Sequence, residues 1–152
     1  MTPLVTPLSA LTQLFAPLRT HAFAYPLLEA IHIIGIALLL GNLVLLELRV
    51  WGWGKAIPAV DLSRLALSLV AIGFSLAAAS GLLMFATQAG ELLANRAFTI
   101  KMLLLTLAAC NAAWFHGRQS LLKLDGLAKL QTFASTLIWI AVIFCGRWIA
   151  YL

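Results

Sequence analysis

Residues 27–50 read LLEAIHIIGIALLLGNLVLLELRV, and this stretch decides the class of fold. It is apolar except for Glu29, His32, Asn42, Glu47 and Arg49. A helix needs about 20 mostly apolar residues to cross roughly 30 Å of hydrocarbon, and the stretch is long enough. Pro26 precedes it and suits the first turn of a helix, where the amide proton that proline lacks would have no partner. The stretch therefore predicts a transmembrane helix.

Three further stretches, residues 65–87, 98–116 and 133–152, have the same apolar character. The whole chain of 152 residues is 63% hydrophobic and only 10% charged, which excludes an ordinary water-soluble domain. Four spans and their connectors use nearly all of the chain and leave no room for a separate soluble domain. Residues 8–18 place apolar side chains at helical spacing, interrupted by Pro17, and predict a short helix on the membrane surface.

The predicted fold is all-α: an integral membrane four-helix bundle, one transmembrane domain over residues 1–152, preceded by a short interfacial helix. The ten Lys and Arg residues outnumber the five Asp and Glu residues, but most of them fall in loops. They are therefore interpreted as topology signals, and the expected partner is the lipid bilayer and not a nucleic acid. The first and third loops carry six basic residues and the opposite side carries four. In a bacterial inner membrane, the positive-inside rule then places both termini in the periplasm.

Ionisable residues of three predicted spans fall at one depth. Glu29 and His32 share a face near the start of the first span, and Lys101 lies near the start of the third. Arg147 lies near the end of the fourth span, so antiparallel packing brings all four to the same side. Charged side chains within a span cost about 2.5–3.5 kcal/mol each, which favours a functional role. The layer is slightly cationic and suits an anionic group. A purely structural alternative is that Glu29 pairs with Lys101 or Arg147, with Arg147 extending to the interface.

The other histidines bear on whether two imidazoles could hold a haem. His116 lies at the far end of the third span, about 20 Å or more from the depth of His32 at a rise of about 1.5 Å per residue. A single haem cannot bridge these two residues. His21 lies on the correct side and could fold back over His32, while Lys101 or Met102 could instead supply the opposing ligand.

Two asparagines and two cysteines also fall within the predicted spans. Asn42 and Asn111 lie at similar depth and could hydrogen-bond across the helices, either as structural contacts or as part of a site. Cys110 and Cys145 lie in apolar stretches, where small buried thiols are expected in preference to a disulfide.

Two segments carry a resemblance to a known group of proteins. The first is Glu29-Ala-Ile-His32-Ile-Ile-Gly35, followed by Gly41 and closed by Leu48-Arg49, and the second is the run Lys101-Met-Leu-Leu-Leu-Thr-Leu. Together they resemble the small four-helix membrane proteins of the HemJ and CopD type, over residues 27–52 and 98–118. The resemblance implies that His32 and Lys101 are hallmark positions. It also implies haem b binding and protoporphyrinogen oxidation, as in HemJ proteins, or copper uptake, as in CopD proteins.

The leading hypothesis is a membrane-embedded haem- or porphyrin-binding protein with a redox role, in which haem b is the cofactor and His32 its axial ligand. Lys101 and Arg147 would lie near the anionic propionates, with Glu29 and His21 beside the site. Small residues of the second span would leave space for a macrocycle, although close packing against a neighbouring helix is the favoured explanation for them. Whether the protein is a haem-dependent oxidoreductase stays open. One alternative is copper or other metal handling through Glu29, His32 and His21. Another is a non-catalytic subunit that joins a membrane partner or a second copy of the chain.

Overall fold

The computed structural model describes residues 7–151, and all of the regular secondary structure in this range is helical. Four helices are long and apolar enough to cross a membrane, which confirms the predicted fold class. They are α2 (Ala24–Val50), α3 (Ala59–Thr87), α5 (Arg96–Gly117) and α7 (Gly126–Trp148). Shorter helices complete the chain: α1 (Pro7–Thr20), α4 (Ala89–Ala94) and α6 (Ser120–Lys123).

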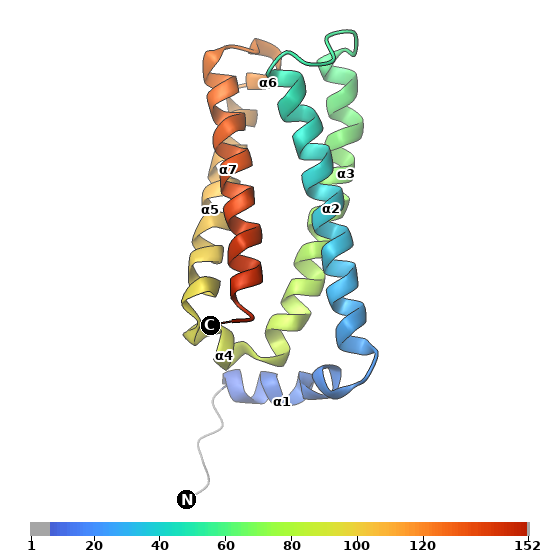
Figure 1. Ribbon diagram of the computed structural model, residues 1–152, viewed down its shortest axis with the longest axis vertical. Helices are drawn as coiled ribbons and strands as arrows, with labels where there is room; N and C mark the ends of the chain where they lie inside the picture. The colour runs from blue at the N-terminus through green and yellow to red at the C-terminus, as the bar shows by residue number, and fades with distance from the viewer. Residues whose placement is uncertain (1–6, 152) are drawn as a thin grey trace, which may run out of the picture.

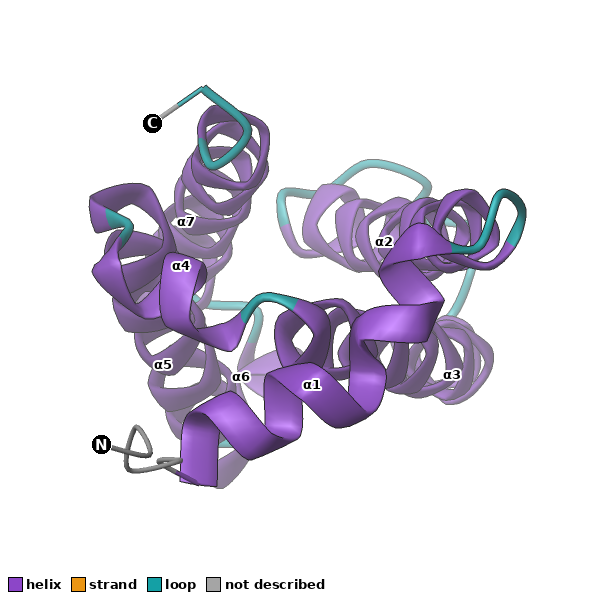
Figure 2. Cartoon of the chain, turned by 90° about the horizontal axis from the view of Figure 1, so that it is seen from below, coloured by secondary structure: helices purple, strands orange, loops and turns teal. Residues whose placement is uncertain are grey.

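The long helices form two pairs, one of α2 with α3 and one of α5 with α7 (Figure 1). The pairs meet through contacts between α2 and α7. The α1 helix lies across one end of the bundle, where it contacts α2, α3 and α4, and the view from below shows it running beneath the spans (Figure 2). Its direction across the bundle end suits a helix that lies on the membrane surface.

The α2 and α3 helices cross closely because glycines face each other at the crossing. A Cβ atom added to Gly35 would lie 2.6 Å from the Ala77 amide nitrogen and 2.8 Å from the Gly73 carbonyl oxygen. A Cβ added to Gly73 would lie 2.6 Å from the Leu39 amide nitrogen and 2.7 Å from the Gly35 carbonyl oxygen. Small residues that let two backbones approach are typical of helix pairs in membranes, because van der Waals packing drives their association there.

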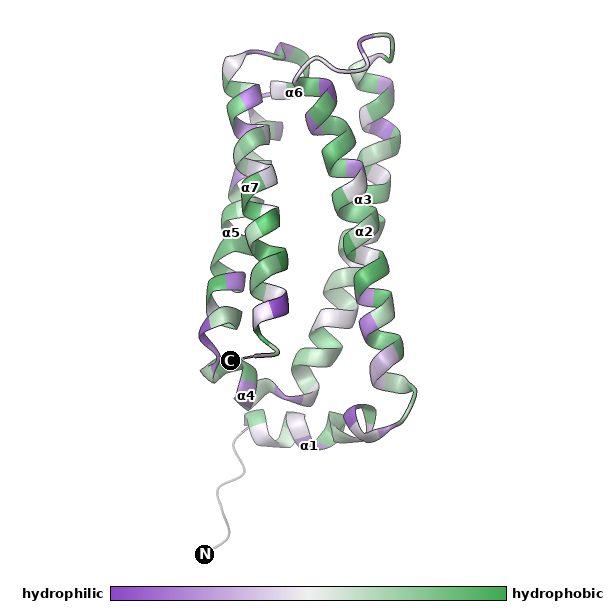
Figure 3. Ribbon diagram, viewed as in Figure 1, coloured by the Kyte–Doolittle hydropathy of each residue, from purple (hydrophilic) through white to green (hydrophobic). Residues whose placement is uncertain are grey.

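The spans consist mostly of apolar residues along their length (Figure 3). Large hydrophobic side chains are widely exposed, including Ile33 at 65%, Leu82 at 67% and Leu103 at 66%. A water-soluble monomer does not expose apolar surface on this scale, whereas hydrocarbon chains of a bilayer cover it without cost. The chain is therefore a multi-pass membrane protein whose spans contact lipid.

All four spans begin earlier than the apolar pattern predicted, α3 and α7 by the largest margin, and α7 ends at Trp148 and not at residue 152. The α3 helix begins at Ala59, and its N-cap is Pro58 with no side-chain hydrogen bond. The α7 helix begins at Gly126 because the Asp125 carboxylate accepts a hydrogen bond from the Ala128 amide at 2.9 Å. Hydropathy marks only the part of a helix that lies in hydrocarbon, so polar helical turns beyond the bilayer go undetected.

The short helices also differ from the expectation. Pro17 does not interrupt α1, since the helix continues to Thr20 and the His21 amide donates to the Pro17 carbonyl at 3.0 Å. The six-residue α4 helix was not predicted, and it is tied to α1 by the ion pair between Arg19 and Glu91 at 3.3 Å.

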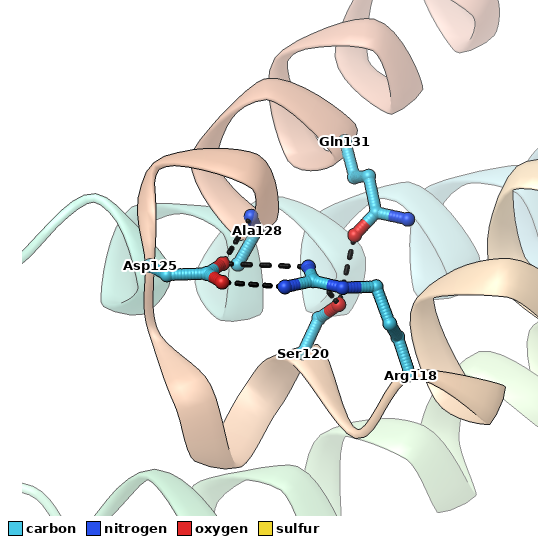
Figure 4. A network of polar contacts seen from close by, with 5 residues as sticks. All are labelled: Arg118, Ser120, Asp125, Ala128 and Gln131. Atoms are coloured by element: carbon cyan, nitrogen blue, oxygen red, sulfur yellow. Dashed lines mark hydrogen bonds and ion pairs between the residues drawn. The ribbon is translucent and has the colours of Figure 1, made fainter.

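A polar network closes the connection between α5 and α7 (Figure 4). The Arg118 guanidinium donates to both carboxylate oxygens of Asp125 and, at 3.2 Å, to the Ser120 hydroxyl. The Ser120 hydroxyl donates in turn to Gln131 Oε1 at 2.8 Å. The guanidinium of Arg118 and then the Ala128 amide hold the pKa of Asp125 below its ordinary value. The folded protein therefore stabilises the charged form of the Asp125 carboxyl group.

We expect Asp125→Ala to lower the midpoint of thermal unfolding at pH 7, and Asp125→Asn to lower it less, because the amide oxygen still caps α7. The pKa of Asp125 is lower in the folded protein than in the unfolded chain. The ionised carboxylate therefore stabilises the fold above the ordinary carboxyl pKa, and this stabilisation is lost as the pH falls through the pKa of the folded state. Circular dichroism melts in detergent at pH 7 and pH 3 measure this. A gap between wild type and Asp125→Asn that stayed the same at both pH values would contradict it.

Candidate functional site

His32 of α2 packs against α3 with a defined protonation of its ring. Its Nδ1 atom lies 2.8 Å from the Ala77 carbonyl oxygen and 3.0 Å from the Ser80 hydroxyl oxygen. A carbonyl oxygen only accepts, and the Ser80 hydroxyl donates its one proton to the Leu76 carbonyl at 2.6 Å or to the Ala77 carbonyl at 3.2 Å. The proton of the neutral imidazole is therefore on Nδ1.

This tautomer leaves the Nε2 lone pair of His32 free. Within residues 7–151 no hydrogen bond to Nε2 is formed. The ring also packs closely against Gly81, since a Cβ added there would lie only 3.1 Å from His32 Cε1. Imidazoles that ligate metals usually donate their other N–H to a carbonyl or carboxylate, which fixes the ring and its tautomer. His32 is arranged in the same way, and so it fits an axial ligand of haem iron.

Lys101 of α5 lies close to α7 and is half-buried. A Cβ added to Gly146 would lie 3.4 Å from Lys101 Nζ, so the ammonium rests over this glycine. In the described part of the chain Lys101 forms no ion pair and no side-chain hydrogen bond. It is near enough to His32 for a Coulombic interaction between the two side chains. The structure therefore brings His32 and Lys101, from different helix pairs, into one neighbourhood.

Glu29 and Arg147 do not join this arrangement by direct contact. The ion pairs formed between described residues are Arg19–Glu91 and Arg118–Asp125, so the alternative that Glu29 pairs with Lys101 or Arg147 is wrong. Glu29 is exposed. Arg147 donates to the Tyr151 hydroxyl at 2.5 Å, and its Cζ atom lies 4.9 Å from the centre of the Tyr151 ring. Arg147 is thereby held at the end of its own helix.

His21 binds the start of α2. Its Nδ1 atom accepts hydrogen bonds from the amides of Phe23 and Ala24 at 3.2 and 3.3 Å, so the ring takes the place of a helix cap. Within residues 7–151 no three His, Cys, Asp or Glu side chains lie together as a metal site. His21, Glu29 and His32 thus do not form the three-ligand cluster that metal handling would need.

Space for a macrocycle was expected at the small residues of the second span, now α3, and that expectation is wrong at Gly73 and Gly81. The α2 backbone fills the space beside Gly73, and the His32 ring fills the space beside Gly81. A bound macrocycle has to lie elsewhere around His32.

The asparagines, Cys110 and His116 form no contact with His32 or Lys101 among the described residues, whereas Cys145 lies near enough to Lys101 for a Coulombic interaction. Asn42 donates to the Leu38 carbonyl of its own helix at 2.8 Å, and Asn111 donates to the Gln131 carbonyl of α7 at 3.0 Å, so the two do not bond to each other. The described cysteines are both free, Cys110 being exposed and Cys145 half-buried. His116 bonds within its own helix through Nδ1, 2.8 Å from the Ala112 carbonyl oxygen.

A buried polar contact between α2 and α7 was missed by the sequence reasoning. Glu47, only 3% exposed, accepts a hydrogen bond from the Thr136 hydroxyl, while its Oε1 atom is buried without a partner among the described residues. Nearby, the indole of Trp51 donates to the Thr132 hydroxyl at 2.8 Å. Thr132 and Thr136 share a helix face at a spacing of four, which is the sequence signal that could have revealed the contact.

The fold and these contacts define a class: a multi-pass helical membrane protein with polar contacts between its helices and an apolar outer surface. Comparison of the chain with protein-family models, curated proteins and solved structures found no match.

Proposed function

We propose that this protein binds haem b or a related porphyrin within the membrane, with His32 Nε2 as an axial ligand, and that it serves a redox reaction. The observation that carries the proposal is the tautomer of His32. Its Nδ1 proton is directed to the Ala77 carbonyl and its Nε2 lone pair has no partner in the described chain. Iron would supply the electron-transfer chemistry, while the chain would hold the imidazole and exclude water.

Lys101 supplies the second argument. A half-buried ammonium without an anionic partner is costly in a membrane, which favours a bound anion beside it. The propionates of a haem are such anions, and a charge-assisted hydrogen bond to one of them would satisfy the ammonium. Arg147 is a further cation at this end of α7, available if it leaves Tyr151. The resemblance of the His32 and Lys101 segments to HemJ proteins points the same way.

The proposed setting is a bacterial inner membrane with both termini in the periplasm. It rests on the excess of basic residues in the loops at the α6 end. The neighbourhood of His32 and Lys101 then lies toward the periplasmic face. The outward face of α5 is largely unburied, which leaves room for a second copy of the chain or a partner subunit. Copper handling is the alternative proposal, although residues 7–151 contain no cluster of three His, Cys, Asp or Glu side chains that could hold the metal.

Titration of the purified protein with haem and with haem dimethyl ester tests both arguments. We expect a Soret band that saturates at one haem per chain, and an affinity about tenfold weaker for the ester, whose masked propionates cannot accept the Lys101 bond as anions. Lys101→Met should weaken haem binding to the level of the ester and leave ester binding unchanged.

Lys123→Met at the other end of the bundle is the matched control and should behave as wild type. A Soret band that does not change when protein is added, with either haem or its dimethyl ester, would overturn the proposal. Equal weakening in both variants would remove Lys101 from the site and leave the role of His32 standing.

A further inference from the structure

The end of the bundle away from His32 holds an open pocket of about 380 Å³. It lies where the end of α2 and the following loop meet the connection from α6 to α7. Its lining is unusual in charge, because it includes three cationic side chains and no acidic one: Arg49, Lys55 and Lys129.

None of these three cations is neutralised by the described protein. The ion pairs in residues 7–151 involve other residues, so the three positive charges that line the pocket have no counter-charge within ion-pair distance. Arg49 uses its Nε–H to bond the Ile57 carbonyl at 2.9 Å, which anchors the side chain. Its two terminal nitrogens form no hydrogen bond with the described protein and are free for a ligand. An anchored guanidinium with free donors suits the tetrahedral oxygens of a phosphate group.

The level of the pocket relative to the membrane indicates the source of its ligand. Trp51 lines it and Trp53 follows in the same loop, 71% exposed, and tryptophans are enriched where a membrane meets water. Apolar side chains, Val50 and Leu124, complete the wall. Basic pockets with an apolar side at the headgroup level are suited to anionic phospholipids, whose phosphate binds the cations while the acyl chains stay in the bilayer.

We propose that this pocket binds the phosphate group of an anionic phospholipid, with Arg49, Lys55 and Lys129 as its ligands. The site is independent of haem binding because it lies at the other end of the spans. A free phosphate shares the same chemistry, so the experiment has to separate a lipid from an inorganic ion.

Protein purified in detergent is titrated with phosphatidylglycerol, with phosphatidylcholine and with inorganic phosphate, and bound molecules are counted by native mass spectrometry. We expect phosphatidylglycerol to bind at one per chain and to exceed phosphatidylcholine. The double variant Lys55→Gln with Lys129→Gln should weaken phosphatidylglycerol binding by about tenfold or more. Arg64→Gln with Lys123→Gln removes two charges from the same end of the bundle but not from the pocket, and should weaken phosphatidylglycerol binding less than about twofold.

The outcomes are distinct. Binding of inorganic phosphate with the same dependence on Lys55 and Lys129 would support the phosphate site and show that the acyl chains contribute little. Equal loss in the two double variants would overturn the proposal, because it would show diffuse attraction of an anionic lipid to the basic loops. The absence of any preference for phosphatidylglycerol over phosphatidylcholine would overturn it as well. Arg49→Lys keeps the charge but removes the guanidinium that is anchored to the Ile57 carbonyl, and it should also weaken phosphatidylglycerol binding.

Discussion

Gly73→Ala is expected to destabilise the folded protein by about 3 kcal/mol or more, and to leave little monodisperse material after detergent extraction. The added methyl group would lie 2.6 Å from the Leu39 amide nitrogen and 2.7 Å from the Gly35 carbonyl oxygen, well inside contact distance. Both atoms belong to the backbone of α2, so no side-chain rotation can relieve the overlap. The helices have to separate, and the contacts along their crossing weaken together.

Gly41→Ala is the matched control for Gly73→Ala. It adds the same methyl group to a glycine of a spanning helix, but a Cβ at Gly41 meets no atom within 4 Å. Alanine forms helix better than glycine by about 1 kcal/mol, so Gly41→Ala should unfold at or above the wild-type temperature. Thermal unfolding followed by size-exclusion chromatography compares the two. A Gly73→Ala protein as stable as Gly41→Ala would show that α2 and α3 do not cross at Gly35 and Gly73.

His32→Ala is expected to abolish the shift and sharpening of the Soret band that haem undergoes on binding to the wild type, because it removes the proposed axial ligand. His116→Ala, a histidine variant at the other end of the bundle, should retain this spectral change. Addition of free imidazole should restore haem binding to His32→Ala, since the space left by the side chain admits the same ligand. This rescue distinguishes ligation from a structural role, for which imidazole in solution would have no effect.

The expectation for His32 can fail in two informative ways. A His32→Ala protein that binds haem with the wild-type spectrum would exclude His32 as the ligand and leave His21 as the candidate histidine on the same side of the membrane. A His32→Ala protein that loses a partner subunit, with no change in any spectrum, would instead support the alternative of a non-catalytic membrane subunit. Thermal unfolding of the variant without haem shows whether it is folded in either case.

Hydrophobicity and length were enough to predict the four spans, since burial in lipid requires long apolar helices. The similar depth of His32 and Lys101 could also be predicted. In an antiparallel bundle the first and third spans begin on the same side of the membrane, and each of these residues lies near the start of its span. The rotation of each helix about its axis could not. Glu29 and His32 share a face of α2 by spacing, yet Glu29 is exposed while His32 contacts α3.

Glu47 shows the same limit from the other side. The sequence marks it only as a charged exception in an apolar stretch, although it is one of the most buried polar residues of the described chain. Its burial depends on where α7 docks, and its partner there, Thr136, lies 89 positions further along the chain. The pairing of α2 with α7, unlike the spans themselves, is a property of the assembled fold and leaves no local pattern in α2 alone.

The division of the spans into two pairs has a consequence for how the protein enters a membrane. The contacts of α2 with α3 involve only residues up to Thr87, so this pair can form as soon as the ribosome has released that much of the chain. Domains generally fold from the N-terminus first during synthesis. The α5 and α7 pair can insert later as a second hairpin, drawn together by the bonds of Arg118 and Asp125. His32 lies in the first hairpin and Lys101 in the second, so a ligand that contacts both residues gains its full set of contacts only once the two hairpins have docked.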